Sequence, residues 1–284
     1  MFKGMNIEKF NKYFNNDDDC KNYLYQIKWK NGYVCKKCGG KRHGKGHSSF
    51  DTRCFRCHHI ESVTANTLFH KIKFPLLKAF GIVFRFAISK NGVSSIEISK
   101  TFQINQKTAW LFLHKIRIAM GFNEIEVRKK AIKEEYTFID SVILSQKGSA
   151  QNGLQRIYIE SFKLTKCNNQ PNPPGIMLYK IRNDKKKYNC LLERGRFIYQ
   201  GKDIRLWNFK SWLIGTHHHC SKKFLQAYLD EFLFKINFGK DKEWFWHNII
   251  QRMVSSKTNS LQGNGTKMDN RRYPVSSKKA NTYE

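Results

Sequence analysis

The stretch Cys35-Lys36-Lys37-Cys38, followed after fifteen residues by Cys54-Phe55-Arg56-Cys57, decides how the first part of this chain folds. Two C-x2-C pairs at this spacing can place four thiolates around one tetrahedral zinc ion. The residues between the pairs are mostly glycine, histidine and basic residues, which cannot form a packed core. The metal would have to hold this segment together, so we predict a structural zinc ion bound by four ligands, Cys35, Cys38, Cys54 and Cys57.

Other interpretations of the four cysteines are that they are reduced structural residues or form two disulfides. Four histidines in the same segment are also potential ligands: His43, His47, His58 and His59. Because four cysteines suffice, we expect these histidines to be solvated or to face DNA. Phe50, Phe55 and Ile60 would supply the small apolar face of a module built from β-hairpins.

The composition points to a polyanionic partner. The 284 residues include 52 Lys and Arg against 22 Asp and Glu, for a formal net charge of +30. A chain this basic repels itself unless it meets a polyanion, and nucleic acid is the commonest one. A histone-like protein shares that balance, but 40% hydrophobic and 14% aromatic residues favour a folded domain.

Targeting signals and membrane spans are not visible in the sequence. No apolar run reaches the roughly 20 residues that cross a bilayer, which predicts no membrane association. The first thirteen residues lack the apolar core of a secretory signal. Together with a zinc pattern among eight cysteines, this predicts a reducing, cytoplasmic location, with nucleoid association through DNA.

Helical periodicity begins at Lys73. A first helix carries a stripe of apolar residues, namely Phe74, Leu77, Gly81, Phe84 and Ile88. A short helix over Ser94–Phe102, a turn over Gln103–Asn105 and a longer helix over Gln106–Met120 follow. This order is that of a helix-turn-helix, although a plain three-helix bundle has the same pattern. The predicted DNA-facing residues of the long helix are Lys107, Trp110, His114 and Arg117.

The second half of the chain alternates strands and helices. Strands are predicted over Glu134–Ser145, Arg156–Leu164 and Ile176–Ile181. A helix is predicted to start at, or to span, Trp207–Gly215. Two more helices are predicted, one over Lys222–Asn237 and one around Trp244–Met253. Asp140 lies inside the first strand, where a carboxylate is costly to bury without a partner. It is a candidate metal ligand for phosphodiester chemistry, and the alternative is an edge-strand acid that faces solvent.

Two further blocks resemble a known family. Trp207–Ser221, with the sequence WNFKSWLIGTHHHCS, and Tyr228–Phe232, with the sequence YLDEF, follow the zinc pattern and the helix-turn-helix pattern. In this order they resemble the zinc-ribbon DDE transposases of bacterial insertion sequences, the ISXO-like, Merlin-related group. The resemblance implies an RNase H-like catalytic domain with an Asp, Asp and Asn triad.

The resemblance also implies residue roles. Asp140 corresponds to the first ligand of catalytic Mg²⁺ or Mn²⁺ and Asn208 to the third, with Lys210 beside it to contact phosphate. The second ligand is expected at Asp184, with Asp203 as the runner-up, and the segment between Asp140 and Asp184 is shortened. Glu231 is expected to be a structural salt-bridge partner, with a late carboxylate near the metals as the alternative.

The sequence therefore predicts an α+β protein of several modules. These are N-terminal helices with a zinc ribbon (1–68), a helix-turn-helix (73–125), an abbreviated RNase H-like α/β domain (134–254) and a disordered basic tail (255–284). The implied function is that of a transposase that binds double-stranded element ends and target DNA as a homo-oligomer, and cleaves and joins strands. The alternative is a non-catalytic zinc-ribbon and helix-turn-helix DNA-binding protein, either a decayed copy of a transposase or a transcription regulator.

Overall fold

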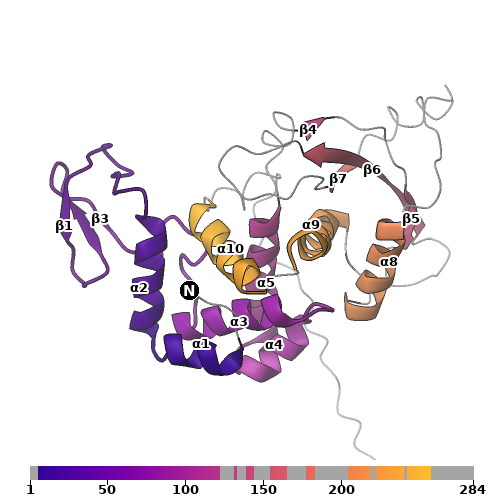
Figure 1. Cartoon of the computed structure of the whole chain (residues 1–284), viewed down its shortest axis with the longest axis horizontal. Coiled ribbons are helices and arrows are strands. Elements are labelled where there is room, and N and C mark those ends of the chain that lie inside the picture. The colour runs from indigo at the N-terminus through magenta and orange to yellow at the C-terminus, as the bar shows by residue number, and fades with distance from the viewer. Residues whose placement is uncertain are drawn as a thin grey trace, which may run out of the picture.

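The computed structural model of the chain describes residues 6–121, 131–132, 139–143, 154–164, 177–182, 204–217, 220, 222–239 and 242–256. Three parts follow one another in space: a small sheet that projects beyond α2, a central group of helices, and a second sheet beside α8 and α9 (Figure 1). Asp184, Asp203 and most of the predicted tail lie outside the described residues.

The first two helices have their start signals in the sequence. α1 (Ile7–Tyr13) begins after Asn6, whose side chain accepts a hydrogen bond from the Lys9 backbone. α2 (Asp17–Lys28) begins with a capping box between Asn16 and Asp19. Such caps satisfy backbone N–H groups that the first turn of a helix leaves unpaired.

α3 (Leu76–Ile88) has no side-chain cap of its own, because Pro75 stands at its N-cap. The missing acceptor comes from α2, where Asp17 Oδ1 accepts from the Leu77 backbone N–H over 2.8 Å. The single apolar stripe predicted for this helix is only partly correct, because two of its members, Leu77 and Gly81, are half-buried rather than buried. The helix contacts α2, α4 and α10, and is therefore buried on several sides, through Leu76, Ala79, Phe80, Ile82, Val83, Phe84 and Phe86.

The next two helices confirm the predicted elements closely. α4 (Ser95–Phe102) is capped by Ser94, and α5 (Gln106–Met120) is capped by Asn105. Between them Gln103 adopts a left-handed conformation with φ 51°, which makes the turn tight. α4 packs directly on α5.

Three helices follow in the last third of the chain: α8 (Ile204–His217), α9 (Lys222–Phe238) and α10 (Lys242–Ser255). α10 joins the core of the N-terminal helices. Its Trp246 lies 6.4 Å from Phe10, 5.4 Å from Tyr23 and 5.9 Å from Phe80 between ring centroids. The first and last described helices thus share one hydrophobic core.

Two antiparallel sheets complete the described structure. The first contains β1 (His43–Lys45), β2 (Thr52–Cys54) and β3 (Ile60–Glu61) in that order, as predicted for the zinc module. In the second, the long β6 (Leu154–Leu164) pairs with β4 (Ala131–Ile132), β5 (Ile139–Ile143) and β7 (Met177–Arg182). β7 also contacts α9, so that helix covers part of this sheet. The three predicted strands are confirmed, whereas the RNase H-like topology stays a prediction.

Candidate functional sites

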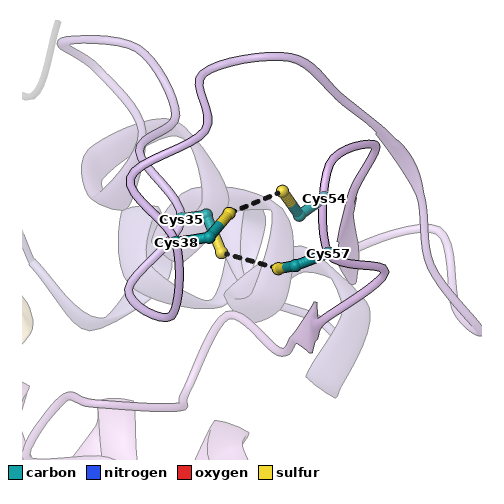
Figure 2. Close-up of side chains that lie close together, drawn as sticks. All are labelled: Cys35, Cys38, Cys54 and Cys57. Carbon is teal, nitrogen blue, oxygen red and sulfur yellow. Dashed lines mark hydrogen bonds between the residues drawn. The ribbon is translucent and has the colours of Figure 1, made fainter.

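The four predicted zinc ligands lie together at one end of the first sheet. The sulfurs of Cys35 and Cys57 are 3.6 Å apart, and so are those of Cys38 and Cys54 (Figure 2). All four Sγ atoms lie within 4.8 Å of one another, and none forms a disulfide. Tetrahedral zinc with Zn–S bonds of about 2.3 Å requires sulfur separations of about 3.8 Å. The donor set therefore fits zinc in both its chemistry and its spacing.

Each cysteine pair is shaped by the same backbone turn. In the first turn the Cys35 N–H donates to the Gly40 carbonyl over 2.9 Å, and in the second the Cys54 N–H donates to the His59 carbonyl over 3.0 Å. The residue after the second cysteine is left-handed in both turns, with φ 72° at Gly39 and φ 55° at His58. The two C-x2-C motifs are thus two copies of one local structure that face each other across the site.

The electrostatics of the cluster favour a bound dication. Burial opposes ionisation of Cys35, but backbone N–H groups of Cys38 and Lys37 point at its sulfur and lower its pKa to about 6. The pKa of Cys54 is lowered in the same way by the N–H of Cys57. For Cys38 the Gly40 N–H lowers the pKa, but the neighbouring sulfurs outweigh it and raise the pKa to about 12. Because like charges crowd here, a positive ion is needed before all four thiols ionise.

Two cysteines elsewhere behave as ordinary buried thiols. Burial raises the pKa of Cys20 to about 12, and the same cause raises that of Cys220 to about 12. Neither belongs to the cluster of four sulfurs. Because the thiolate is the reactive form of cysteine, the raised pKa makes both thiols poor nucleophiles.

A buried ion pair joins the zinc module to the helices. Lys28, at the end of α2, lies 2.8 Å from Glu61 on β3, and both side chains are almost fully buried. Lys28 also donates to the backbone carbonyls of Ser62 and Ala65. The prediction that Phe55 belongs to the apolar face of the zinc module is wrong, because this side chain is 57% exposed. The buried aromatic residue beside the cysteines is Tyr33 instead.

The candidate catalytic residue Asp140 lies on β5, the predicted strand. Ile139 pairs with Ile157 and Val142 with Gln155, so Asp140 and Ser141 together oppose Arg156 alone. Two residues opposite one is a β-bulge, a feature that re-aims side chains and is enriched beside active sites. Asn208 is exposed on α8 and Lys210 is half-buried there. Asp184 lies outside the described residues, so the triad stays a prediction.

The predicted DNA-facing side of α5 is largely covered by α9. The Trp110 ring lies 4.8 Å from Phe224, and the His114 ring lies 5.1 Å from the same residue. Burial lowers the pKa of His114 to about 4, with Arg117 and Lys223 adding to the effect. Among the predicted contacts on this helix, Lys107 remains exposed, in the first turn.

Arg117 requires a correction, because it is buried and cannot reach DNA. Its Nε donates to Glu231 Oε2 over 2.6 Å, and its guanidinium lies 4.2 Å from the Tyr228 ring centroid. Lys235 approaches the other oxygen of Glu231 at 3.1 Å. The expectation that Glu231 is a structural salt-bridge partner is confirmed. Burial opposes ionisation of Glu231, but Lys235 and Arg117 hold its pKa below the usual range.

The contact between one face of α5 and one face of α9 was not predicted from the sequence. On α5 the covered residues are Trp110, His114 and Arg117; on α9 their partners are Phe224, Tyr228 and Glu231. Each set is spaced at three or four residues, which is the signal of a helix face. The signal is present in the sequence, but nothing local indicates that the two faces meet.

Comparison with known proteins identifies two segments of the chain. Residues 15–60 match the transposase zinc-ribbon domain, and residues 192–237 match the ISXO2-like transposase domain. Together these matches support a zinc-ribbon DDE transposase of the IS1595 family, and the resemblance predicted from sequence is confirmed. No curated protein and no solved structure matches the chain. Within the described residues, no helix has the length and apolar character that crossing a membrane requires.

Proposed function

We propose that this protein binds the terminal inverted repeats of an insertion sequence and catalyses metal-dependent DNA strand cleavage and strand transfer. The observation that carries the proposal is the presence, in one chain, of a zinc-ribbon segment and a transposase segment of the same family. The net charge of +30 supports a polyanionic substrate. Handling two ends at once requires at least a dimer on DNA.

The catalytic site that we propose consists of Asp140, Asp184 and Asn208. Carboxylate and amide oxygens are the ligands that Mg²⁺ and Mn²⁺ prefer, so the three side chains fit a divalent ion. When bound, such ions activate the attacking oxygen and stabilise the leaving oxygen of an in-line displacement. The β-bulge at Asp140 supports this assignment, because it sets that residue apart from the regular ladder of β5. Lys210 would position a phosphate beside the ligands.

The DNA-binding surface that we propose differs from the predicted one. Because α9 covers Trp110, His114 and Arg117, the exposed part of α5 is its first turn, around Lys107. Helix-turn-helix proteins read base edges with the N-terminal residues of the second helix, which agrees with this location. The zinc module would add phosphate contacts through its exposed Lys and Arg side chains.

A strand-cleavage assay tests the proposal. The substrate is a supercoiled plasmid that carries the ends of the element, incubated with the full chain and Mg²⁺ or Mn²⁺. Asp140→Ala should abolish cleavage and leave affinity for end DNA nearly unchanged. Asp18→Ala, which removes an exposed carboxylate on α2, is the charge-matched control and should cleave normally.

Two outcomes would contradict the proposal. Equal cleavage by Asp140→Ala would remove this residue from the mechanism. Specific binding of the ends without cleavage by the unaltered protein, in either metal, would leave a non-catalytic DNA-binding protein.

A further inference from the structure

Phe55 occupies an unusual place for a large apolar side chain. It lies between two zinc ligands, Cys54 and Cys57, yet 57% of its surface is exposed. Burying a phenylalanine is favourable by about 2 kcal/mol, so a small module gains nothing from leaving it in water. An exposed aromatic ring on a basic surface is instead a common feature of sites that bind nucleic acid.

Phe55 directly follows β2 and continues its alternation, which puts it on the outer face of the zinc module. Thr52 and Cys54 are buried, whereas Arg53 and Phe55 point outward. Across the hairpin, the Phe55 N–H donates to the Arg42 carbonyl over 3.2 Å. Arg53 pairs with Gly44 in the ladder. The four residues Arg42, Gly44, Arg53 and Phe55 therefore form one face, which we call the outer ribbon face.

Gly44 allows the Phe55 ring to lie against the backbone of β1. A Cβ atom at this position would be 2.8 Å from Phe55 Cε1 and 3.0 Å from Cζ. These distances are shorter than side-chain atoms tolerate, so any other residue at position 44 would displace the ring. The ring is thus supported from one side by backbone while more than half of its surface remains open.

The surroundings of the ring are cationic. Between residues 34 and 60 there is one acidic residue, Asp51, and seven basic ones. All seven are exposed: Lys36, Lys37, Lys41, Arg42, Lys45, Arg53 and Arg56. Among the described residues no carboxylate lies in ion-pair range of any of them. Even after the charge of −2 on a zinc ion with four thiolates, the segment keeps a net positive charge.

We infer that the outer ribbon face stacks an unpaired base of DNA on Phe55, with Arg42 and Arg53 on the flanking phosphates. Aromatic rings bind any base through its face, while cations follow the backbone, and the two together select single-stranded over paired segments. The inference rests on the proposed function, because strand cleavage at an element end creates the free ends at which base pairs fray. It assigns to the zinc module a preference for frayed or cleaved ends over blunt duplex.

The test compares two DNA ligands with the full, zinc-loaded chain. One is a blunt duplex of the terminal repeat, and the other is the same duplex with a short single-stranded fork that contains 2-aminopurine. Phe55→Ala should weaken binding of the fork roughly tenfold and abolish the fluorescence change of the stacked base, while blunt-duplex affinity changes less than about twofold. Phe55→Trp should retain both signals, and Gly44→Val should resemble Phe55→Ala.

Controls separate stacking from structural damage. Zinc content measured by metal analysis should stay the same in all variants. Ile7→Ala removes an equally exposed apolar side chain, 56% exposed, from α1 and should bind both ligands normally. Equal losses on both ligands, no loss on the fork, or a changed oligomeric state of Phe55→Ala would each overturn the inference.

Failure of the stacking site and failure of the proposed function would give different results in this test. If the unaltered protein binds and cleaves its element ends but Phe55→Ala keeps the fork preference, only the stacking site is wrong. If the unaltered protein binds neither ligand, the proposed function is wrong and the stacking site with it.

Discussion

Arg117 and Glu231, which are 114 positions apart in the chain, form a buried ion pair with a single N–O distance of 2.6 Å. The pair links α5, the candidate DNA-binding helix, to α9, which lies inside the segment that matches a transposase domain. The candidate DNA-binding helix and the transposase segment are therefore joined by a buried polar contact. Lys235 and the Tyr228 ring complete the surroundings of the two charges.

Breaking this pair should destabilise the protein strongly. Arg117→Met leaves Glu231 charged with Lys235 as its remaining partner, and loss of one member of a buried pair typically costs about 3–5 kcal/mol of unfolding free energy. The measurement is urea unfolding followed by circular dichroism. Arg85→Met is the matched control: Arg85 and Glu97 lie 2.8 Å apart but are exposed, so the loss should stay below about 1 kcal/mol. Similar losses in both variants would show that burial does not strengthen the Arg117 contact.

Zinc should be lost when one ligand is replaced. We expect Cys57→Ser to lower bound zinc from about one ion per chain to nearly none, because a structural site needs all four ligands. The N-terminal module should then become sensitive to protease. Cys20→Ala replaces a buried cysteine outside the cluster and should keep its zinc. Full zinc content in Cys57→Ser would exclude this residue as a ligand.

The left-handed residue in each cysteine turn predicts opposite effects of two substitutions. His58 has φ 55°, which costs a residue with a side chain about 1 kcal/mol, so His58→Gly should raise the thermal midpoint of the zinc module slightly. Gly39→Ala introduces the same strain at φ 72° and should lower it. Thermal unfolding of the zinc-loaded variants measures both midpoints. A decrease for His58→Gly would mean that the hydrogen bond between Arg53 and His58 outweighs the strain.

His114 should make stability depend on pH in the mildly acidic range. Its pKa falls from 6.5 to about 4 on folding, chiefly because the ring is buried between Trp110 and Phe224. Between these two values the unfolded chain binds a proton that the folded protein does not, so stability decreases as pH falls from about 6.5 towards 4. His114→Phe keeps a ring at this position and removes the titration. The unfolding free energy of that variant should change less between pH 7 and pH 5 than that of the unaltered protein.

DNA affinity should fall steeply with salt. Each phosphate that a cation neutralises releases counterions and adds about −0.9 to the slope of log affinity against log salt. Arg56→Gln on the zinc module should reduce the magnitude of that slope by about one. Lys12→Gln on α1 removes an exposed cation far along the chain from the module and should leave the slope unchanged. A flat salt response of the unaltered protein would argue against a polyanionic partner.

The features that sequence predicted well are those with local causes. The zinc site follows from cysteine spacing, and the limits of α4 and α5 follow from Ser94 and Asn105, whose side chains cap the helices. The strand that carries Asp140 follows from a run of apolar residues. In each case the residues that determine the structure are neighbours in the chain.

The features that sequence did not predict depend on distant partners. The sequence predicts that Arg117 faces DNA because it lies on the face of α5 opposite the apolar repeat, whereas its partner Glu231 comes from α9. The cap of α3 comes from Asp17 on another helix. The sequence predicts Phe55 on the apolar face of the module, but its ring is exposed and lies over Gly44, where there is no side chain to displace it. The first two relations join residues 114 and 60 positions apart, and the third joins two different segments of the zinc module, so none appears as a pattern along a single helix or strand.

The position of Trp246 against Phe10 and Tyr23 has a consequence for synthesis on the ribosome. The helices that emerge first lack a large part of their packing until α10 has been translated. A chain that stalls before residue 242 would expose those aromatic rings and become a target for chaperones or proteases. Prematurely terminated copies would thus be removed before they could accumulate.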